Sequence, residues 1–133
     1  MTGYLLDTNI LSDLVRNPAG KVTQRIQHIG DGNVATSIIA AAKLRFGAEK
    51  KGSQRLSDQV ETVLDAIEIL PFEPPADATY AIIRANLEKT RRPIAANDLL
   101  IAAHAITLDC TLVTDNERDF WRIRGLSSVN WLR

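Results

Sequence analysis

The sequence predicts an α/β domain of three layers, in which a mainly parallel central sheet is flanked by helices. Short apolar runs that suit buried strands alternate with longer segments whose apolar residues recur at helical spacing. The chain has 133 residues and 45% hydrophobic content, with seven glycines and five prolines. These values are typical of one folded domain rather than a disordered or collagen-like chain, so we expect a single domain over residues 1–133.

Each expected element follows from its apolar spacing and from the residues at its ends. The first apolar run stops at Asp7, and Thr8 or Asn9 is the expected N-cap of the helix that follows. Ser37 is placed in the same way to cap a helix that starts at residue 38. The expected order is a strand at 4–6, helices ending near 16 and at 22–29, a strand at 33–37, helices at 38–51 and 57–67, a strand at 67–72, helices at 76–89 and 98–106, and strands at 110–114 and 129–132.

Charge, cysteine content and hydropathy exclude several classes of protein. Sixteen Lys and Arg balance sixteen Asp and Glu, so any contact with nucleic acid must be local. The single Cys110 excludes a disulfide framework and a multi-cysteine zinc site, and it fits a reducing compartment. No run approaches the roughly 20 apolar residues that span a bilayer, and no basic region precedes the first apolar residues. We expect a cytoplasmic protein without a membrane partner.

Three acidic residues stand where a parallel sheet would bring them together. Asp7 and Asp115 directly follow apolar strands, and Asp98 opens the most apolar helix. Since the carboxyl ends of parallel strands share one edge, we expect the three carboxylates to converge there. Grouped carboxylates repel one another and need a cation, and oxygen ligands without a Cys or His set favour Mg²⁺ or Mn²⁺. Taken singly, each acid also has a structural explanation as a helix-start or turn residue.

Four short motifs occur in a fixed order along the chain. They are Leu5-Leu6-Asp7-Thr8-Asn9-Ile10, Thr36-Ser37-Ile38 with Leu44-Arg45-Phe46-Gly47, Asn97-Asp98-Leu99-Leu100-Ile101-Ala102-Ala103-His104-Ala105, and Leu112-Val113-Thr114-Asp115-Asn116. Together they resemble the motifs of VapC-like PIN-domain toxins over essentially the whole chain. The resemblance implies a metal-dependent endoribonuclease that cuts structured RNA, commonly tRNA or a ribosomal RNA loop, and so inhibits translation.

The same resemblance implies partners and residue roles. The partner is a VapB-like antitoxin, in a complex that contains a toxin homodimer and reaches operator DNA only through the antitoxin. Asp7, Asp98 and Asp115 would hold one or two Mg²⁺ or Mn²⁺ ions. The supporting residues are Asn9, Thr114 and Asn116, with Asp119 acting through water or serving only as an exposed helix acid.

An antitoxin segment is expected over an apolar groove beside the acids, with a basic side chain near them. Leu11, Leu14, Val15 and Phe46 are candidates for that groove, and burial in the core is the alternative for each.

Lys43 departs from the family pattern at a position of the expected metal site. The residue before the Leu-x-Phe/Tyr-Gly motif is a Glu in the family, the fourth acid of the site, whereas this chain has Lys43. Its helical neighbours are apolar, so we expect the ammonium to be partly enclosed and to pair with Asp7 or Asp98. One ligand is lost and one repulsive charge is gained, so we expect metal-dependent cleavage to be weak or absent.

A second departure lies before Asp98. The family pattern Gly-x-Pro-Ile-Gly reads Arg91-Arg92-Pro93-Ile94-Ala95 here. If either family glycine needs a positive φ, its replacement is strained. The two arginines are either phosphate contacts beside the site or a solvated helix end.

Two other functions compete with an active toxin. The first is a non-catalytic homologue that binds RNA or sequesters the antitoxin, with Lys43 contacting phosphate. The second is a small phosphotransfer or nucleotide-binding domain that uses Asp7 and Asp98, although the sequence has no phosphate-binding glycine loop. His104 lies among apolar residues in the middle of its helix, so we expect a structural role for it.

Overall fold

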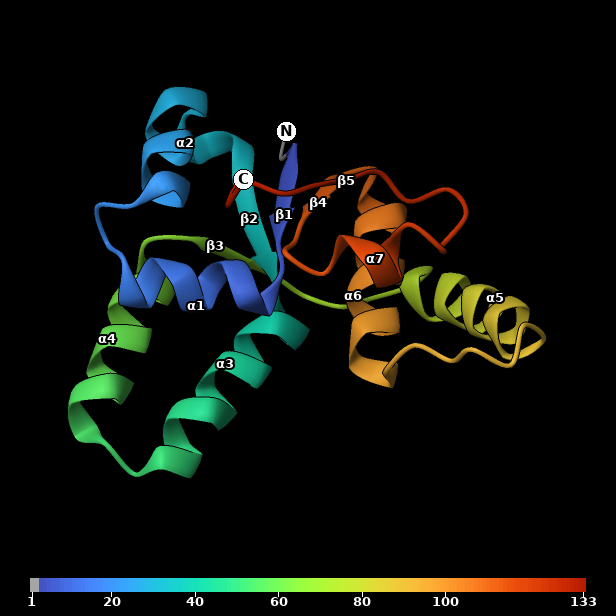
Figure 1. Cartoon of the computed structure of the whole chain (residues 1–133), viewed down its shortest axis with the longest axis horizontal. Helices are drawn as coiled ribbons and strands as arrows, with labels where there is room; N and C mark the ends of the chain where they lie inside the picture. The colour runs from blue at the N-terminus through green and yellow to red at the C-terminus, as the bar shows by residue number, and fades with distance from the viewer. Residues whose placement is uncertain (1–2) are drawn as a thin grey trace.

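The computed structural model describes residues 3–133 and is organised around a five-stranded sheet with the order β3-β2-β1-β4-β5 (Figure 1). The strands are β1 (Tyr4–Leu6), β2 (Val34–Ser37), β3 (Glu68–Leu70), β4 (Thr111–Val113) and β5 (Ser128–Val129). All neighbouring strands are parallel, and Leu5 of β1 pairs with Ala35 of β2 and Leu112 of β4. The chain order reverses between β1 and β4, which is where open parallel sheets place their sites.

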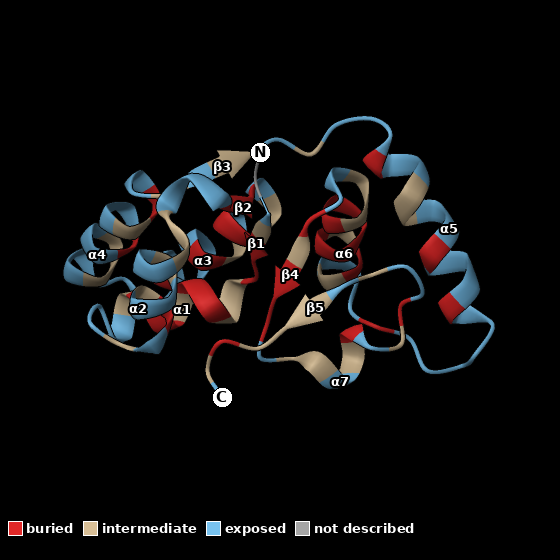
Figure 2. Cartoon of the chain, turned by 90° about the horizontal axis from the view of Figure 1, so that it is seen from above, coloured by how far each residue is buried: buried red, intermediate tan, exposed pale blue. Residues whose placement is uncertain are grey.

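Helices cover both sides of the sheet, and this confirms the predicted three-layer α/β architecture (Figures 1 and 2). The first group comprises α1 (Thr8–Arg16), α2 (Lys21–Ile29), α3 (Ile38–Lys51) and α4 (Gln54–Asp65), with a short 3-10 turn, η1 (Asp31–Asn33), before β2. The second group comprises α5 (Ala76–Glu88), α6 (Ala96–Leu108) and α7 (Glu117–Phe120). Within residues 3–133, no helix is both long and apolar enough to cross a membrane.

The core lies between the sheet and these helices. Leu5, Leu6 and Leu112 of the central strands are fully buried, as are Ile10 and Leu11 of α1. Helix α6 is enclosed on most of its surface, as its apolar sequence predicts, and Figure 2 shows it as one of the most buried helices. The neighbouring polar residues are held within this frame: the Thr36 hydroxyl donates to the Leu6 carbonyl oxygen at 2.7 Å.

Three helix or strand ends differ from the expected ones because of local hydrogen bonds. Asp7 caps α1 in place of Thr8 or Asn9, because its carboxylate accepts from the Thr8 amide at 2.8 Å. Helix α4 begins at residue 54 rather than 57, because the Ser53 hydroxyl accepts from the Leu56 amide. The last strand ends at residue 129 rather than 132, since the Asn130 side chain accepts from the Leu132 amide and turns the chain.

Arg91 stands where the family pattern has a glycine, and its φ is +60°. The backbone strain expected where a family glycine is replaced is therefore found at Arg91. The second position, Ala95, has φ −54° and carries no such strain. A left-handed conformation costs an L-residue with a side chain about 1–2 kcal/mol.

We expect Arg91→Gly to raise the free energy of unfolding by about 1 kcal/mol, because glycine adopts a positive φ without a steric penalty. The matched control is Arg92→Gly, whose backbone has no positive φ and which should lower stability by about 0.5–1 kcal/mol through the entropy of the unfolded chain. Urea unfolding of both variants measures the difference. Equal destabilisation by the two substitutions would show that residue 91 is not strained.

Candidate functional site

Asp7 is the most deeply enclosed of the predicted site acids. It follows β1 and its side chain is only 3% exposed. The Thr8 amide donates to one carboxylate oxygen, and the Thr114 hydroxyl donates to the other at 2.7 Å. Burial is the main cause that raises the pKa of Asp7, and the negative charge of Asp98 adds to it, while the Thr114 and Thr8 hydrogen bonds and the charge of Lys43 act in the opposite direction.

Lys43 pairs with Asp98 across the carboxyl edge of the sheet. The ammonium Nζ of Lys43, on α3, lies 3.3 Å from Oδ1 of Asp98, on the first turn of α6. The two side chains are 34% and 17% exposed. Both charges also act on the pKa of Asp7, so the three groups form one electrostatic unit.

Two supporting residues hold Asp7 in place through a chain of hydrogen bonds. The Thr114 hydroxyl that donates to Asp7 also accepts from the Asn116 amide at 3.0 Å. The Asn116 side chain donates in turn to the carboxylate of Asp119 at 3.2 Å. The loop after β4 is therefore tied to the end of β1, and Asp119 belongs to this network.

Among the described residues, Asp115 is linked to Asp7 through its main chain and not through its carboxylate. Its amide donates to the Asn9 side-chain oxygen at 3.1 Å, and Asn9 donates to Asp7 at 3.4 Å. The Asp115 carboxylate is turned toward Asn130, whose side chain donates to it at 2.9 Å. The sequence analysis assigns no role to Asn130, which lies just after β5.

As they lie, these side chains do not fit a divalent metal ion. Among residues 3–133, no group of three or more His, Cys, Asp or Glu side chains is arranged to hold one. Both oxygens of Asp7 already accept hydrogen bonds, and Lys43 supplies the cation beside Asp98. The positive charge that a group of carboxylates requires is thus provided by the chain itself.

A groove of about 230 Å³ adjoins Lys43 between α1, α3 and α4. Val15, Leu44 and Leu56 contribute apolar surface to it, and Arg16 and Lys51 contribute charge. Of the four candidates for such a groove, only Val15 lines it. Leu11 and Leu14 are buried in the core, and Phe46 is 66% exposed outside the groove lining.

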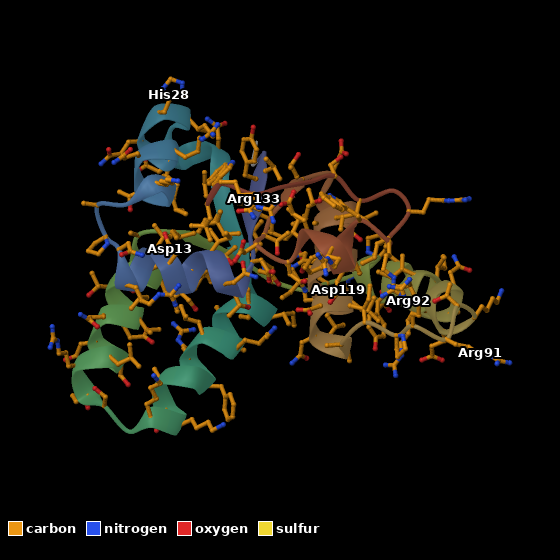
Figure 3. All side chains as sticks on the ribbon, viewed as in Figure 1. Asp13, His28, Arg91, Arg92, Asp119 and Arg133 are labelled. Atoms are coloured by element: carbon orange, nitrogen blue, oxygen red, sulfur yellow. The ribbon has the colours of Figure 1, made fainter. Side chains whose placement is uncertain are left out.

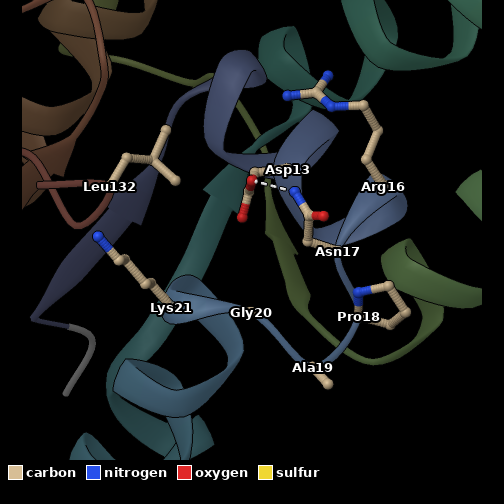
Figure 4. Close-up of a pocket in the computed structure, with 8 residues that line it drawn as sticks. All are labelled: Asp13, Arg16, Asn17, Pro18, Ala19, Gly20, Lys21 and Leu132. Atoms are coloured by element: carbon tan, nitrogen blue, oxygen red, sulfur yellow. Dashed lines mark hydrogen bonds between the residues drawn. The ribbon is translucent and has the colours of Figure 1, made fainter.

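A larger hollow, of about 560 Å³, lies at the other end of α1 (Figure 4). Asp13 lies in its wall and is only 7% exposed. One of its oxygens accepts from the Asn17 side chain at 2.8 Å, and the Asn17 amide donates to the Asp13 carbonyl oxygen. The Asp13 side chain and backbone thus close the last turn of α1. Asp13 lies toward the opposite end of this helix from Asp7 and is not part of the group formed by Asp7, Asp98 and Lys43.

His104 has the structural role that was expected of it. The ring is 1% exposed, and its Nδ1 lies 2.8 Å from the Ser37 hydroxyl oxygen. That hydroxyl already accepts from the Ile39 amide as the cap of α3, so its single proton is free to bond Nδ1. Burial lowers the pKa of the ring, which is held in its neutral form.

Comparison with known proteins identifies the family. Residues 4–126 match the model of the PIN domain. The chain is 34% identical over 133 residues to ribonuclease VapC2 of Haemophilus influenzae, covering 99% of this chain and 100% of that protein. It is 31% identical over 132 residues to the tRNA(fMet)-specific endonuclease VapC of Shigella flexneri, with coverage of 98% and 99%.

Solved structures agree with this. The toxin–antitoxin pair VapBC from Salmonella typhimurium, bound to DNA, contains a chain that superposes with a TM-score of 0.90 at 30% identity, covering 98% of this chain and 99% of that one. VapBC2 of Rickettsia felis, bound to a promoter fragment, gives 0.84 at 34% identity with coverage of 96% and 98%. The chain belongs to the PIN-domain family, and among its members it is similar to the VapC ribonucleases along its full length.

We expect the stability of the protein to fall as the pH drops below the ordinary histidine pKa of 6.5. The unfolded chain takes up a proton on His104 near that pH, whereas the buried ring resists protonation, so protonation favours unfolding by at most about 1.4 kcal/mol per pH unit. Urea unfolding between about pH 7 and pH 5.5 should show this slope, and His104→Leu should remove it. The control is His28→Leu on the exposed side of α2, which should keep it. An identical slope in both variants would contradict the assignment.

Proposed function

We propose that this chain is the toxin subunit of a VapBC-type toxin–antitoxin pair, an endoribonuclease by family whose cleavage of RNA is attenuated by Lys43. The observation that carries the proposal is the ion pair of Lys43 with Asp98 at 3.3 Å, in a chain similar to VapC ribonucleases over its full length. The function proposed is cleavage of a structured RNA in the cytoplasm, with inhibition of translation as its result.

The names of the relatives support RNA as the substrate class. Those relatives are ribonucleases, and two are endonucleases specific for tRNA(fMet), so a folded RNA such as tRNA is the substrate we propose. VapBC complexes bound to DNA support a VapB-like antitoxin as the partner, with operator DNA reached through it. A toxin homodimer is the form that we propose within that complex.

The proposed residue roles follow the hydrogen bonds. Asp7, Asp98 and Asp115 are the acids of the cleavage centre, and Mg²⁺ or Mn²⁺ is the cofactor proposed for the family arrangement. Asn9 and Thr114 are positioning residues because they donate to Asp7. Asn116 and Asp119 are also proposed as positioning residues. The Asn116 amide donates to the hydroxyl of Thr114, and the Asn116 side chain donates to Asp119, which fixes the loop after β4.

Attenuation follows from charge. A glutamate at position 43 would add a carboxylate beside Asp98, whereas Lys43 adds an ammonium that is already paired with it. A unit positive charge about 4 Å from a divalent ion opposes its binding by several kcal/mol at an effective dielectric constant of about 20. Solvent reduces this at the partly exposed Lys43, yet each 1.4 kcal/mol that remains is a tenfold loss of affinity.

The groove between α1, α3 and α4 is the place we propose for an antitoxin segment, because its apolar floor lies next to Lys43. A basic antitoxin side chain was expected near the acids. With Arg16, Lys43 and Lys51 on the wall, this chain already supplies that charge, so an apolar segment with acidic side chains fits better.

We expect little Mg²⁺-dependent cleavage of folded RNA by this chain, and a gain on the order of a hundredfold in Lys43→Glu, because one repulsive charge is replaced by one oxygen ligand. Cleavage of total tRNA, followed on denaturing gels with Mg²⁺ or Mn²⁺, measures it. Toxicity on expression should return with the same substitution.

Two further variants distinguish the effect of the added positive charge on cleavage from the effect of the lost carboxylate ligand. Lys43→Met removes the charge without adding a ligand and should give an intermediate rate, while Lys50→Glu makes the same charge change on the exposed surface of α3 and should change nothing. Equal cleavage by this chain and by Lys43→Glu would show that the fourth acid is dispensable. Tight RNA or antitoxin binding without cleavage by any variant would favour the non-catalytic homologue.

A further inference from the structure

Six cationic side chains gather on two segments that lie side by side, although the chain as a whole has no net charge. One segment is the turn after α5 and the other runs from α7 into the loop before β5. We call this surface the arginine face, and it consists of Lys89, Arg91, Arg92, Arg118, Arg122 and Arg124. All six are exposed except Arg122, which is half-buried. Figure 3 shows Arg91 extending away from the body of the molecule beyond the end of α5.

The positive charge of this face is not neutralised by the protein. The ion pairs within residues 3–133 join other cations, namely Lys43, Arg45, Arg84 and Arg133, to their acids. The two acids of the same segments are also engaged, since Glu117 pairs with Arg133 at 3.6 Å and Asp119 accepts from Asn116. A patch of unpaired cations in an otherwise neutral protein is the electrostatic footprint of a polyanion.

The two segments are held together and enclose a groove. The Arg122 guanidinium donates to the Arg92 carbonyl oxygen and to the Thr90 hydroxyl oxygen, so it bridges the turn and the loop. A groove of about 500 Å³ lies between α5, the start of the turn at Thr90 and the loop, and its lining includes Asn86, Arg122 and Arg124. Arg91 lies outside this lining and carries its charged side chain at a positive φ.

An aromatic ring completes the surface. Trp121 is 66% exposed next to Arg122, whereas the second tryptophan, Trp131, is 3% exposed in the core. Ile82, on the groove wall, is also exposed, at 64%. A flat exposed ring among cations can stack an unpaired base while the guanidinium groups bind the flanking phosphates.

Both segments of the arginine face lie close in the sequence to residues of the proposed site. The turn that carries Arg91 and Arg92 leads within four residues into α6, whose first turn carries Asp98. Helix α7, which carries Arg118, also carries Asp119 of the network around Asp7. Both segments of the face are therefore joined directly to elements that carry residues of the proposed site.

We propose that the arginine face binds the single-stranded part of the RNA substrate, with Trp121 stacking a base and the arginines contacting phosphates. The proposal rests on the ribonuclease function proposed above and assigns its substrate-binding surface. A second copy of this chain is the competing occupant. A two-fold interface on this surface would set the same unpaired cations against one another, which disfavours it.

The test is binding of fluorescein-labelled total tRNA to the full chain in EDTA, by fluorescence anisotropy across a salt series. Reversing three of the four exposed arginines of the face to Glu, in Arg91→Glu/Arg118→Glu/Arg124→Glu, should weaken binding at least about tenfold and lower the slope of log K against log salt by about 2. The matched control, Arg25→Glu/Lys50→Glu/Arg55→Glu, makes the same net charge change at exposed positions elsewhere and should weaken binding less than about threefold. Trp121→Ala should weaken it roughly tenfold without changing the salt slope.

Three outcomes would overturn the proposal: an equal loss in both triple variants, an unchanged affinity in Trp121→Ala, or a changed oligomeric state in light scattering with unchanged RNA binding. The last would identify the face as a contact between copies. Circular dichroism of each variant confirms that it is folded. Because binding is measured without metal or cleavage, a Lys43→Glu variant that fails to cut RNA would reject the proposed activity and leave this surface standing.

Discussion

The ion pair of Lys43 and Asp98 is the interaction on which the proposed function of this site depends. Asp7 is buried at the end of β1 and Asp98 acts on it electrostatically, so a positive charge is required nearby. The chain supplies that charge from α3, at 3.3 Å from Asp98. In the function we propose, the same side chain opposes a metal ion between these acids.

The parallel sheet positions this pair. Asp7 ends β1 and caps α1, Thr114 ends β4 and donates to Asp7, and the two strands are neighbours at the point where the strand order reverses. Ser37 at the end of β2 caps α3, the helix that carries Lys43, and His104 of α6 fixes the Ser37 hydroxyl. Three strand ends and two helices thus converge at this site.

Much of this arrangement could be predicted from the sequence, because apolar periodicity and the rule that parallel strands end on one edge are local and geometric. The pairing of Lys43 with a site acid followed from its apolar helical neighbours and the charges opposite, and it is confirmed with Asp98. The turn of Asp115 toward Asn130 could not be predicted, since that contact joins the ends of two strands through a loop. Of the arginine face, the sequence indicated only Arg91 and Arg92, as candidate phosphate contacts. The rest could not be predicted, because whether Arg118 or Arg124 is paired depends on which acids the fold brings near them.

The relation between Lys43 and the metal is tested most directly by calorimetric titration of Mn²⁺ into the folded protein, without RNA. We predict no detectable binding of Mn²⁺ to this chain and clear binding to Lys43→Glu, with Lys43→Met between them, because the ammonium beside Asp98 takes the place of the ion. Binding of Mn²⁺ to this chain as tight as to Lys43→Glu would contradict it, since the lysine would then neither remove a necessary ligand nor repel the metal.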